Sequence, residues 1–207
     1  AWLRGHRFLT QKRVIVPRAP ISELLAEHLE PWVDDPENVQ HVLDLCTGSG
    51  CLAILAALAF PNAQVDAVDL SDHAIRLAQR NVDMYQLGER VNVLQGDLYT
   101  PLKKQRYDVI VCNPPYVNST TMAQLPSEYQ HEPSLALAGG DDGMDIIRTI
   151  LDQAAAHLSD DGFIVLEIGN EYENFMNAFP ALNPVFLETA EGDDSVLLLT
   201  REQLQPR

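Results

Sequence analysis

The segment Asn113-Pro114-Pro115-Tyr116 holds the residues of this 207-residue chain that are best suited to chemistry. The Asn113 side-chain oxygen and the Pro114 carbonyl are hydrogen-bond acceptors, and the prolines have no N–H groups that compete for them. Two such acceptors suit a planar NH2 group, against which the Tyr116 ring can lie. Holding both N–H bonds would aim the nitrogen of an amide or aromatic amine at an electrophile. A simple proline turn that closes a strand is the alternative interpretation.

A glycine turn, Thr47-Gly48-Ser49-Gly50, follows another apolar run and precedes a helical pattern. Gly48 allows a tight turn, and Gly50 lets a ligand approach the backbone. Asp69 lies nineteen residues after Gly50, at the end of the next apolar run, where a carboxylate can accept hydrogen bonds from two ribose hydroxyls. These features predict a nucleotide-like ligand, and a dinucleotide oxidoreductase shares them.

The elements that position these residues are predicted to form a parallel sheet. A continuous apolar run such as Val109–Cys112 is typical of a buried central strand. The proline pair that follows Asn113 cannot continue the strand, so the strand ends before Asn113. Ligands bind at the carboxyl ends of the strands in open α/β sheets, so we expect both groups of residues at one edge. The predicted parallel strands are Val42–Cys46, Val65–Asp69, Val91–Leu94, Val109–Cys112 and Phe163–Ile168.

Both ends of the chain add elements to this core. Val185–Leu187 and Ser195–Thr200 predict a final antiparallel pair, which gives seven strands. Near the start, we expect a hairpin within His6–Pro17 and a helix that begins at Pro20 and carries apolar residues to Leu29. The segment Val117–Asp142 has few regular patterns and is interpreted as a lid over the site.

The net charge of −16 is unevenly distributed. Residues 1–22 carry five basic and no acidic residues, so the remainder carries −21. An acidic body repels phosphate backbones, which disfavours stable DNA binding and suits a basic protein partner. Simple solubility is the alternative explanation for the charge.

The composition also limits cofactors and location. Cys46, Cys51 and Cys112 fall inside apolar patterns without a second Cys or His pair at ligand spacing, so we expect small buried residues and no metal. No apolar run reaches membrane-spanning length, and the first twenty residues lack the apolar core of a signal peptide. A cytoplasmic protein is expected. The chain opens without an initiator Met and is interpreted as a piece of something longer.

In order along the chain, Asp44-Leu45-Cys46-Thr47-Gly48-Ser49-Gly50, Asp69, Asp97 and Asn113-Pro114-Pro115-Tyr116 resemble the protein-glutamine methyltransferases of the HemK class. The resemblance implies an α/β fold, the Rossmann-like seven-stranded class I arrangement. It also implies S-adenosyl-L-methionine as methyl donor, S-adenosyl-L-homocysteine as product, and a glutamine side-chain amide as acceptor.

The resemblance assigns roles to residues of this chain. The catalytic set is Asn113, Pro114, Pro115 and Tyr116. The cofactor-binding set is Asp44, Thr47, Gly48, Ser49, Gly50, Asp69, Leu70, Asp97, Leu98 and Asn113. For Asp44 the alternative is that its carboxylate only accepts from local backbone donors, and for Asp97 the alternative is an ordinary turn.

Two segments indicate the branch of the family. Pro17–Glu23 and Tyr129–Pro133 are similar to the PrmB branch, which methylates a glutamine in large-subunit ribosomal protein number three. Residues 1–33 are interpreted as a remnant of, or link to, a substrate domain, and 34–207 as the catalytic domain. The alternatives are a release factor as substrate, a nucleic-acid amine methyltransferase, and an adapter that keeps the fold without the activity.

Overall fold

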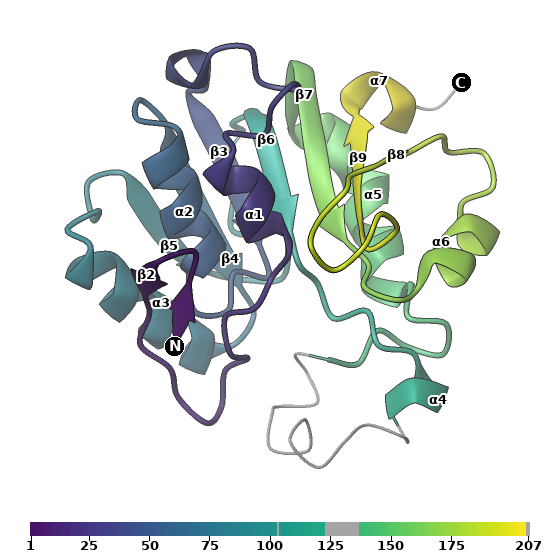
Figure 1. Cartoon of the computed structure of the whole chain (residues 1–207), viewed down its shortest axis with the longest axis horizontal. Coiled ribbons are helices and arrows are strands. Elements are labelled where there is room, and N and C mark those ends of the chain that lie inside the picture. Colours follow the sequence, from purple (N-terminus) through teal and green to yellow (C-terminus); the bar gives the residue numbers. More distant parts are fainter. Residues whose placement is uncertain (103, 123–136, 206–207) are drawn as a thin grey trace.

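One seven-stranded sheet forms the centre of the computed structural model, which describes residues 1–102, 104–122 and 137–205 (Figure 1). The strand order is β5-β4-β3-β6-β7-β9-β8. All neighbouring pairs from β5 to β7 are parallel, and β9 runs antiparallel to both β7 and β8. The predicted sheet is therefore confirmed. The strands are β3 (His41–Leu45), β4 (Gln64–Asp69), β5 (Val91–Gln95), β6 (Tyr107–Cys112), β7 (Leu158–Glu167), β8 (Val185–Phe186) and β9 (Val196–Thr200).

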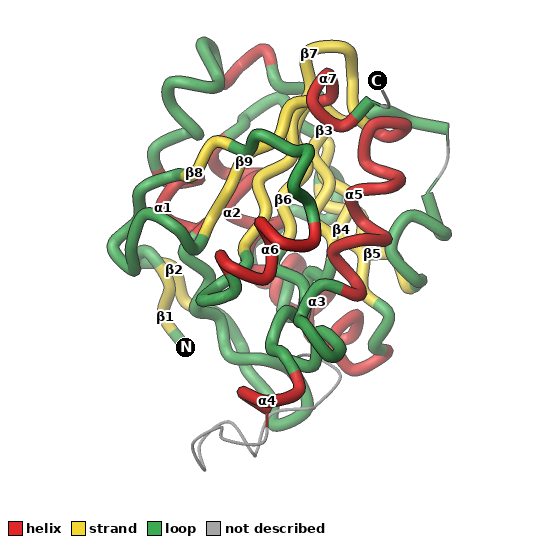
Figure 2. Tube along the Cα trace, turned by 90° about the vertical axis from the view of Figure 1, so that its right-hand side faces the viewer, coloured by secondary structure: helices red, strands yellow, loops and turns green. Residues whose placement is uncertain are grey.

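Helices cover both faces of the sheet, and alternate residues of each strand contact opposite layers. Val42 of β3 packs in the cluster that holds α1 and α2, whereas Leu43 packs in the cluster that holds α5. Figure 2 shows the sheet edge-on between these layers. The helices are α1 (Ile21–Ala26), η1 (Pro36–Asn38), α2 (Cys51–Ala59), α3 (Asp72–Met84), α4 (Ser119–Met122), α5 (Asp145–His157), α6 (Tyr172–Ala178) and α7 (Arg201–Leu204). No described helix is long and apolar enough to cross a membrane.

The strand order reverses between β3 and β6, which places a crevice at their carboxyl ends. From β3 the chain moves outward through β4 to β5, then returns to pair β6 with the other side of β3. The connections that follow β3 and β6 lead to opposite sides of the sheet, so the loops after these two strands lie apart. Open α/β sheets bind ligands at such a point. The glycine turn follows β3 and Asn113 follows β6, so the topology brings both predicted groups to this crevice.

The predicted hairpin within His6–Pro17 is wrong. The hairpin lies earlier, between β1 (Trp2–Leu3) and β2 (His6–Arg7), and no strand forms from Phe8 to Pro17. The buried Asn81 of α3 explains the difference. Its side chain accepts a hydrogen bond from the Leu9 N–H (2.8 Å) and donates one to the Leu9 carbonyl (3.3 Å). The backbone groups that a hairpin would use are therefore bound to a helix.

Two helices end before the predicted residue. The sequence predicts one helix with apolar residues to Leu29 and another that Ser71 caps and Gly88 ends, but α1 ends at Ala26 and α3 at Met84. Each helix closes with a pair of reversed hydrogen bonds around a left-handed residue that is not glycine, His28 in one case and Gln86 in the other. This is the Schellman arrangement, in which glycine is the usual residue. The glycine at position 88 was therefore a misleading signal.

The predicted lid lies partly outside the described residues, which omit 123–136. Of the flanking parts, Val117 pairs with Ala138 in a short parallel bridge. Gly139 and Gly143 lie against Tyr116, because a Cβ atom at either position would lie within 3.0 Å of Tyr116 backbone atoms. The end of the segment is therefore packed against the Asn113–Tyr116 loop.

Candidate active site

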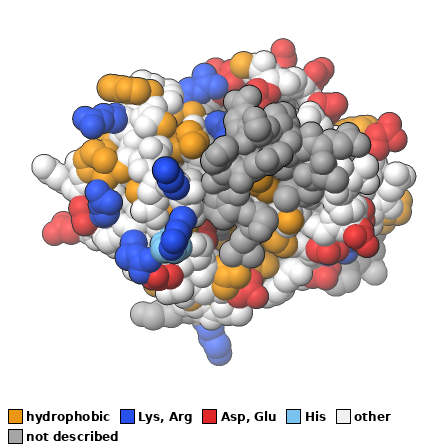
Figure 3. Space-filling model, turned by 90° about the horizontal axis from the view of Figure 1, so that it is seen from below, with side chains coloured by type: hydrophobic (Ala, Val, Ile, Leu, Met, Phe, Trp, Pro, Cys, Tyr) orange, Lys and Arg blue, Asp and Glu red, His pale blue; other side chains and the backbone are white. Residues whose placement is uncertain are grey.

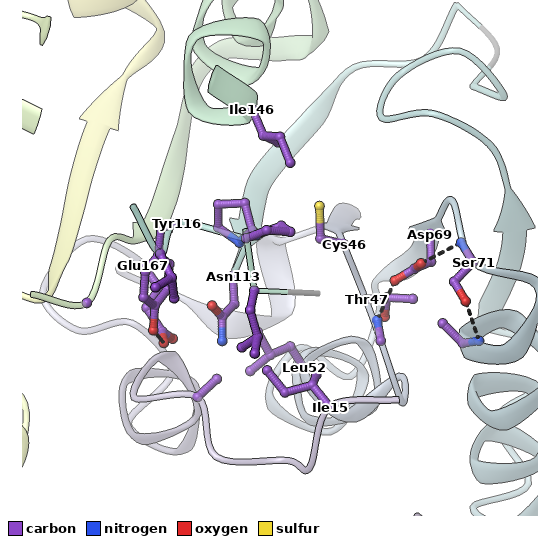
Figure 4. Close-up of a pocket in the computed structure, with 18 of the residues that line it drawn as sticks. Ile15, Cys46, Thr47, Leu52, Asp69, Ser71, Asn113, Tyr116, Ile146 and Glu167 are labelled. Atoms are coloured by element: carbon purple, nitrogen blue, oxygen red, sulfur yellow. Dashed lines mark hydrogen bonds between the residues drawn. The ribbon is translucent and has the colours of Figure 1, made fainter. Parts of the chain in front are cut away.

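A cavity of about 840 Å³ opens at the crevice between β3 and β6. Its volume lies within the range of small-molecule and cofactor sites. Figure 4 shows Asn113, Tyr116 and Glu167 on one side and Thr47, Asp69 and Ser71 on the other. Of the predicted site residues, those that line the cavity are Thr47, Gly48, Ser49, Asp69, Leu70, Asp97, Leu98, Asn113, Pro114, Pro115 and Tyr116.

Asp69 ties the glycine turn to the end of β4. One carboxylate oxygen accepts from the Gly48 N–H (2.9 Å) and the other from the Ser71 N–H (2.8 Å). Burial raises the pKa of this carboxyl, and hydrogen bonds from the backbone N–H groups of Ser71, Gly48 and Leu70 lower it. A carboxylate offers about four acceptor positions, so acceptor capacity remains for a ligand. That arrangement fits the two adjacent hydroxyls of a ribose.

Two predicted cofactor residues, Asp44 and Gly50, are not among the residues that line the cavity. Asp44 is fully buried below the turn, where its Oδ2 accepts from the Thr47 hydroxyl (2.5 Å) and the Ala53 N–H (3.0 Å). Gly50 has a φ of +79°, and a Cβ there would lie 3.1 Å from the Ala78 Cβ. Both residues support the turn, and direct contact of Asp44 or Gly50 with the cofactor stays a prediction.

The buried Asp44 predicts a pH-dependent stability. Burial is the main reason that its pKa rises from 3.8 to about 7. The folded chain then binds this proton more tightly than the unfolded chain, so the free energy of unfolding falls as pH rises from about 4 to about 7. The expected contribution is on the order of a few kcal/mol.

Urea unfolding between pH 4 and 8 measures this effect. Asp44→Asn is isosteric with the protonated acid and should show a shallower decline than the unmodified chain. An unchanged slope in Asp44→Asn would mean that Asp44 is not the titrating group.

The loop after β5 also lines the cavity, on the side of β4 that faces away from β3. Asp97 is exposed at the rim, and Leu98 is half-buried with a φ of +47°. Gly96 is required here, because a Cβ would lie 2.6 Å from the Pro101 ring. Leu70, Asp97 and Leu98 thus form a wall with apolar side chains and one carboxylate, which suits a planar base with an amino group.

The Asn113–Tyr116 segment leaves the sheet at the end of β6, as predicted. Pro114 is buried, and the other three residues are partly exposed to the cavity. The Tyr116 hydroxyl donates to Glu167 Oε1 (3.1 Å), and burial together with Glu167 raises the pKa of Tyr116. Gly169 lies directly beside the ring, since a Cβ there would be 2.4 Å from Tyr116 Cε2. The ring is therefore held at its edge and its hydroxyl.

A methyl group at position 169 should disturb this ring without touching the glycine turn. Gly169→Ala places a Cβ against Tyr116 and puts a non-glycine residue at a φ of +53°. We expect methyl transfer to fall by about tenfold or more, with a stability loss of about 1–3 kcal/mol, while cofactor affinity is retained.

Calorimetric titration and urea unfolding check these outcomes. Gly88→Ala is the matched control, because nothing lies within 4 Å of a Cβ there and its φ is not in the left-handed region. Equal turnover in both variants would show that the ring position is not critical.

Two groups of cavity residues were not in the predicted site sets, and of these only Arg18 had been considered as a residue at the border of the pocket. The segment from Arg13 to Ala19 lies along the cavity. Asn81 also donates to the Ser49 carbonyl (2.8 Å), so it joins the glycine turn to Leu9, which precedes this segment. Glu167 at the end of β7 also lines the cavity, as does Glu171, which accepts from Asn118 and Asn174. A carboxylate inside an apolar strand pattern, as at Glu167, was the available signal.

The three cysteines differ in environment. Cys51 and Cys112 are buried as predicted, whereas Cys46 is half-buried; Cys46 and Cys51 both line the cavity. The φ of +59° at Cys46 turns the chain from β3 into the glycine turn and brings the side chain to the cavity wall. All three are free thiols.

Charges are segregated on the face that surrounds the cavity. Figure 3 shows Lys and Arg gathered on one side of this face and Asp and Glu toward the other. His73 of α3 contributes to the basic side, where its ring contacts both Arg13 and Arg76.

Comparisons with known proteins identify the class of enzyme. Residues 20–127 match the family described as methyltransferase small domain. The fold is similar to that of a methyltransferase from Pyrococcus furiosus, with a TM-score of 0.65, 18% identity, and coverage of 96% of this chain and 90% of that chain. It is also similar to the hMettl16 catalytic domain in complex with an RNA hairpin, with a TM-score of 0.67, 17% identity, and coverage of 95% and 75%. The chain is a class I methyltransferase.

Closer relatives identify the family. The ribosomal protein uL3 glutamine methyltransferase of Bordetella pertussis is 63% identical over 204 residues, which cover 99% of this chain and 68% of the relative. That of Burkholderia pseudomallei is 58% identical, with coverage of 99% and 69%. This chain belongs to the family of the ribosomal protein uL3 glutamine methyltransferases, and it spans about two thirds of the length of these relatives. The predicted family and branch are confirmed.

Proposed function

We propose that this chain transfers a methyl group from S-adenosyl-L-methionine to the side-chain amide nitrogen of a glutamine in ribosomal protein uL3. The observation that carries the proposal is the cavity at the β3–β6 crevice, which is lined by both the glycine turn and the Asn113–Tyr116 segment. The uL3 substrate follows from the names of relatives that are 63% and 58% identical.

The residues around Asp69 fit the proposed cofactor. The free lone pairs of Asp69 would accept from the ribose hydroxyls, and Asp97 would accept from the adenine amino group between Leu70 and Leu98. The turn from Thr47 to Ser49 would face the methionine part, and Asp44 and Gly50 would hold that turn in place. The bound cofactor supplies an electrophilic methyl group on a positively charged sulfur.

Asn113 and Pro114 would hold the glutamine NH2 group as acceptors, and Tyr116 would pack against the amide plane. The amide nitrogen forms the new N–C bond, the electron pair of the broken S–C bond stays on sulfur, and the nitrogen then releases a proton to water. Orientation of this kind lowers barriers by up to ~7–11 kcal/mol in well-aligned cases. Pro115 would stiffen the segment, because its ring fixes φ.

The charge distribution supports a basic substrate. The chain outside residues 1–22 carries −21, which attracts a positively charged protein and weakens nonspecific binding to DNA. A ribosomal substrate would place the reaction in the cytoplasm. We further propose that residues 1–33 link the catalytic domain, 34–207, to substrate recognition.

Mass spectrometry of peptides tests the proposal. Purified uL3 is incubated with the protein and S-adenosyl-L-methionine, and a gain of one methyl group on a glutamine is expected. A release factor and a ribosomal RNA fragment serve as parallel substrates at physiological salt. Methylation of either of these in preference to uL3 would overturn the proposed substrate, and no methylation of any would overturn the proposed activity.

A further inference from the structure

Glu167 is a buried carboxyl group in the cavity wall with no role in the fold described above. It is the last residue of β7, is 4% exposed, and belongs to a strand whose neighbouring residues are apolar. A carboxyl group in such a place costs free energy unless its partners compensate. The chain keeps it next to the segment that is proposed to hold the substrate.

The contacts of Glu167 are with two residues of the Asn113–Tyr116 segment. Oε1 accepts from the Tyr116 hydroxyl at 3.1 Å. Oε2 is buried and has no close hydrogen-bond partner among the described residues, and the Asn113 amide makes only a weaker contribution that lowers the pKa of Glu167. Figure 4 shows Asn113, Tyr116 and Glu167 side by side. One oxygen atom is thus available to a group that comes from Asn113.

The charges around Glu167 come from several elements. Burial raises its pKa from 4.5 to about 8, Tyr116 and Arg18 lower the pKa, and Glu191 raises it. Glu167 in turn contributes to raising the pKa of the buried Cys112 thiol of β6, after burial and Cys46. Near neutral pH, Glu167 therefore exists in both protonation states.

The protonation state of Glu167 would decide which end of the Asn113 amide faces the substrate. A carboxylate only accepts hydrogen bonds, so it attracts the Asn113 NH2 group and leaves Oδ1 directed at the cavity. A protonated acid can donate to Oδ1, which would turn the NH2 group toward the cavity. A glutamine NH2 group needs an acceptor, so only the first orientation binds it.

We propose that Glu167 is a positioning residue whose carboxylate form orients the Asn113 amide and the Tyr116 ring to receive the substrate glutamine. The inference rests on the proposed function, since it concerns the orientation of the Asn113 amide in the same glutamine-binding site. It also makes the enzyme sensitive to pH through Glu167.

The test is the pH dependence of kcat/KM for uL3 at saturating cofactor, because this profile reports groups of the enzyme before the protein substrate binds. The unmodified chain should gain about tenfold per pH unit below the pKa of Glu167 and level off above it. Glu167→Gln cannot ionise and should give a flat profile, about tenfold or more below the plateau. Its cofactor affinity should be unchanged.

Glu173→Gln is the matched control, because Glu173 is exposed on α6 and the substitution makes the same chemical change outside the cavity. It should keep the full pH profile. A Glu167→Gln profile that keeps the rise seen in the unmodified chain would overturn the inference, even if activity is lower.

Failure of the inference differs from failure of the proposed function. If no substrate is methylated, binding of a glutamine peptide to the chain loaded with S-adenosyl-L-homocysteine is measured instead at pH 6.5 and 9. Tighter binding at pH 9, lost in Glu167→Gln, supports the positioning role without turnover. Binding that does not change with pH would overturn it.

Discussion

Asn113→Ala is expected to lower kcat for methyl transfer by about 10²–10³-fold while cofactor affinity stays nearly unchanged. Asn113 follows β6 at the strand-order reversal and faces the cavity beside Tyr116 and Glu167. Alanine removes one of the two proposed acceptors, so the glutamine nitrogen is no longer aimed at the methyl group. Single-turnover kinetics with uL3 and calorimetric titration of the cofactor measure the two quantities separately.

Asn183→Ala is the matched control for this change, because Asn183 is exposed and is not among the cavity residues. It should leave both quantities unaltered. If Asn113→Ala weakens cofactor binding as much as it slows transfer, Asn113 acts chiefly on the cofactor, and the proposed acceptor role is wrong.

Asp69→Ala is expected to have the opposite effect, a loss of cofactor affinity of about 100-fold or more. Hydrogen bonds to a charged group contribute about 1.5–3 kcal/mol each, and about 1.4 kcal/mol corresponds to tenfold in affinity. The variant removes two proposed bonds to the ribose and also frees the Gly48 and Ser71 N–H groups that now hold the turn in place. At saturating cofactor, kcat should be affected much less than in Asn113→Ala.

Circular dichroism must show that Asp69→Ala remains folded, and Asp161→Ala, an exposed aspartate of β7, is the control. Cofactor affinity within a few-fold of the unmodified chain would mean that the ligand does not use this carboxylate. A dinucleotide oxidoreductase would instead be stabilised by a nicotinamide cofactor, which can be compared directly in a thermal shift experiment.

The sheet could be predicted from the sequence because its strands are continuous apolar runs that end in distinct polar signals. Val109–Cys112 ends at two prolines, and the run before Gly48 ends at a glycine turn. Because parallel strands have their carboxyl ends at the same edge of the sheet, the sequence also predicted that Asn113 and Asp69 lie in one cavity. The final antiparallel pair had a clear turn sequence between its strands.

Contacts between distant segments could not be predicted in the same way. The Leu9 backbone bonds to Asn81, which is 72 residues away and carries no local sign of this role. His28 and Gln86 are left-handed residues at the ends of α1 and α3, a position where glycine is the usual residue. Glu167 was visible as an acid in an apolar strand, but its partner Tyr116 lies 51 residues earlier. Each of these depends on tertiary packing rather than on a local pattern.

The most direct test of the proposed active site is a crystal structure of this chain with S-adenosyl-L-homocysteine and a uL3 peptide that contains the target glutamine. We predict that the glutamine NH2 group donates to Asn113 Oδ1 and the Pro114 carbonyl, with its amide plane against Tyr116 and its nitrogen facing the cofactor sulfur. A glutamine bound elsewhere, or a cofactor that does not contact the turn at Gly48, would contradict it.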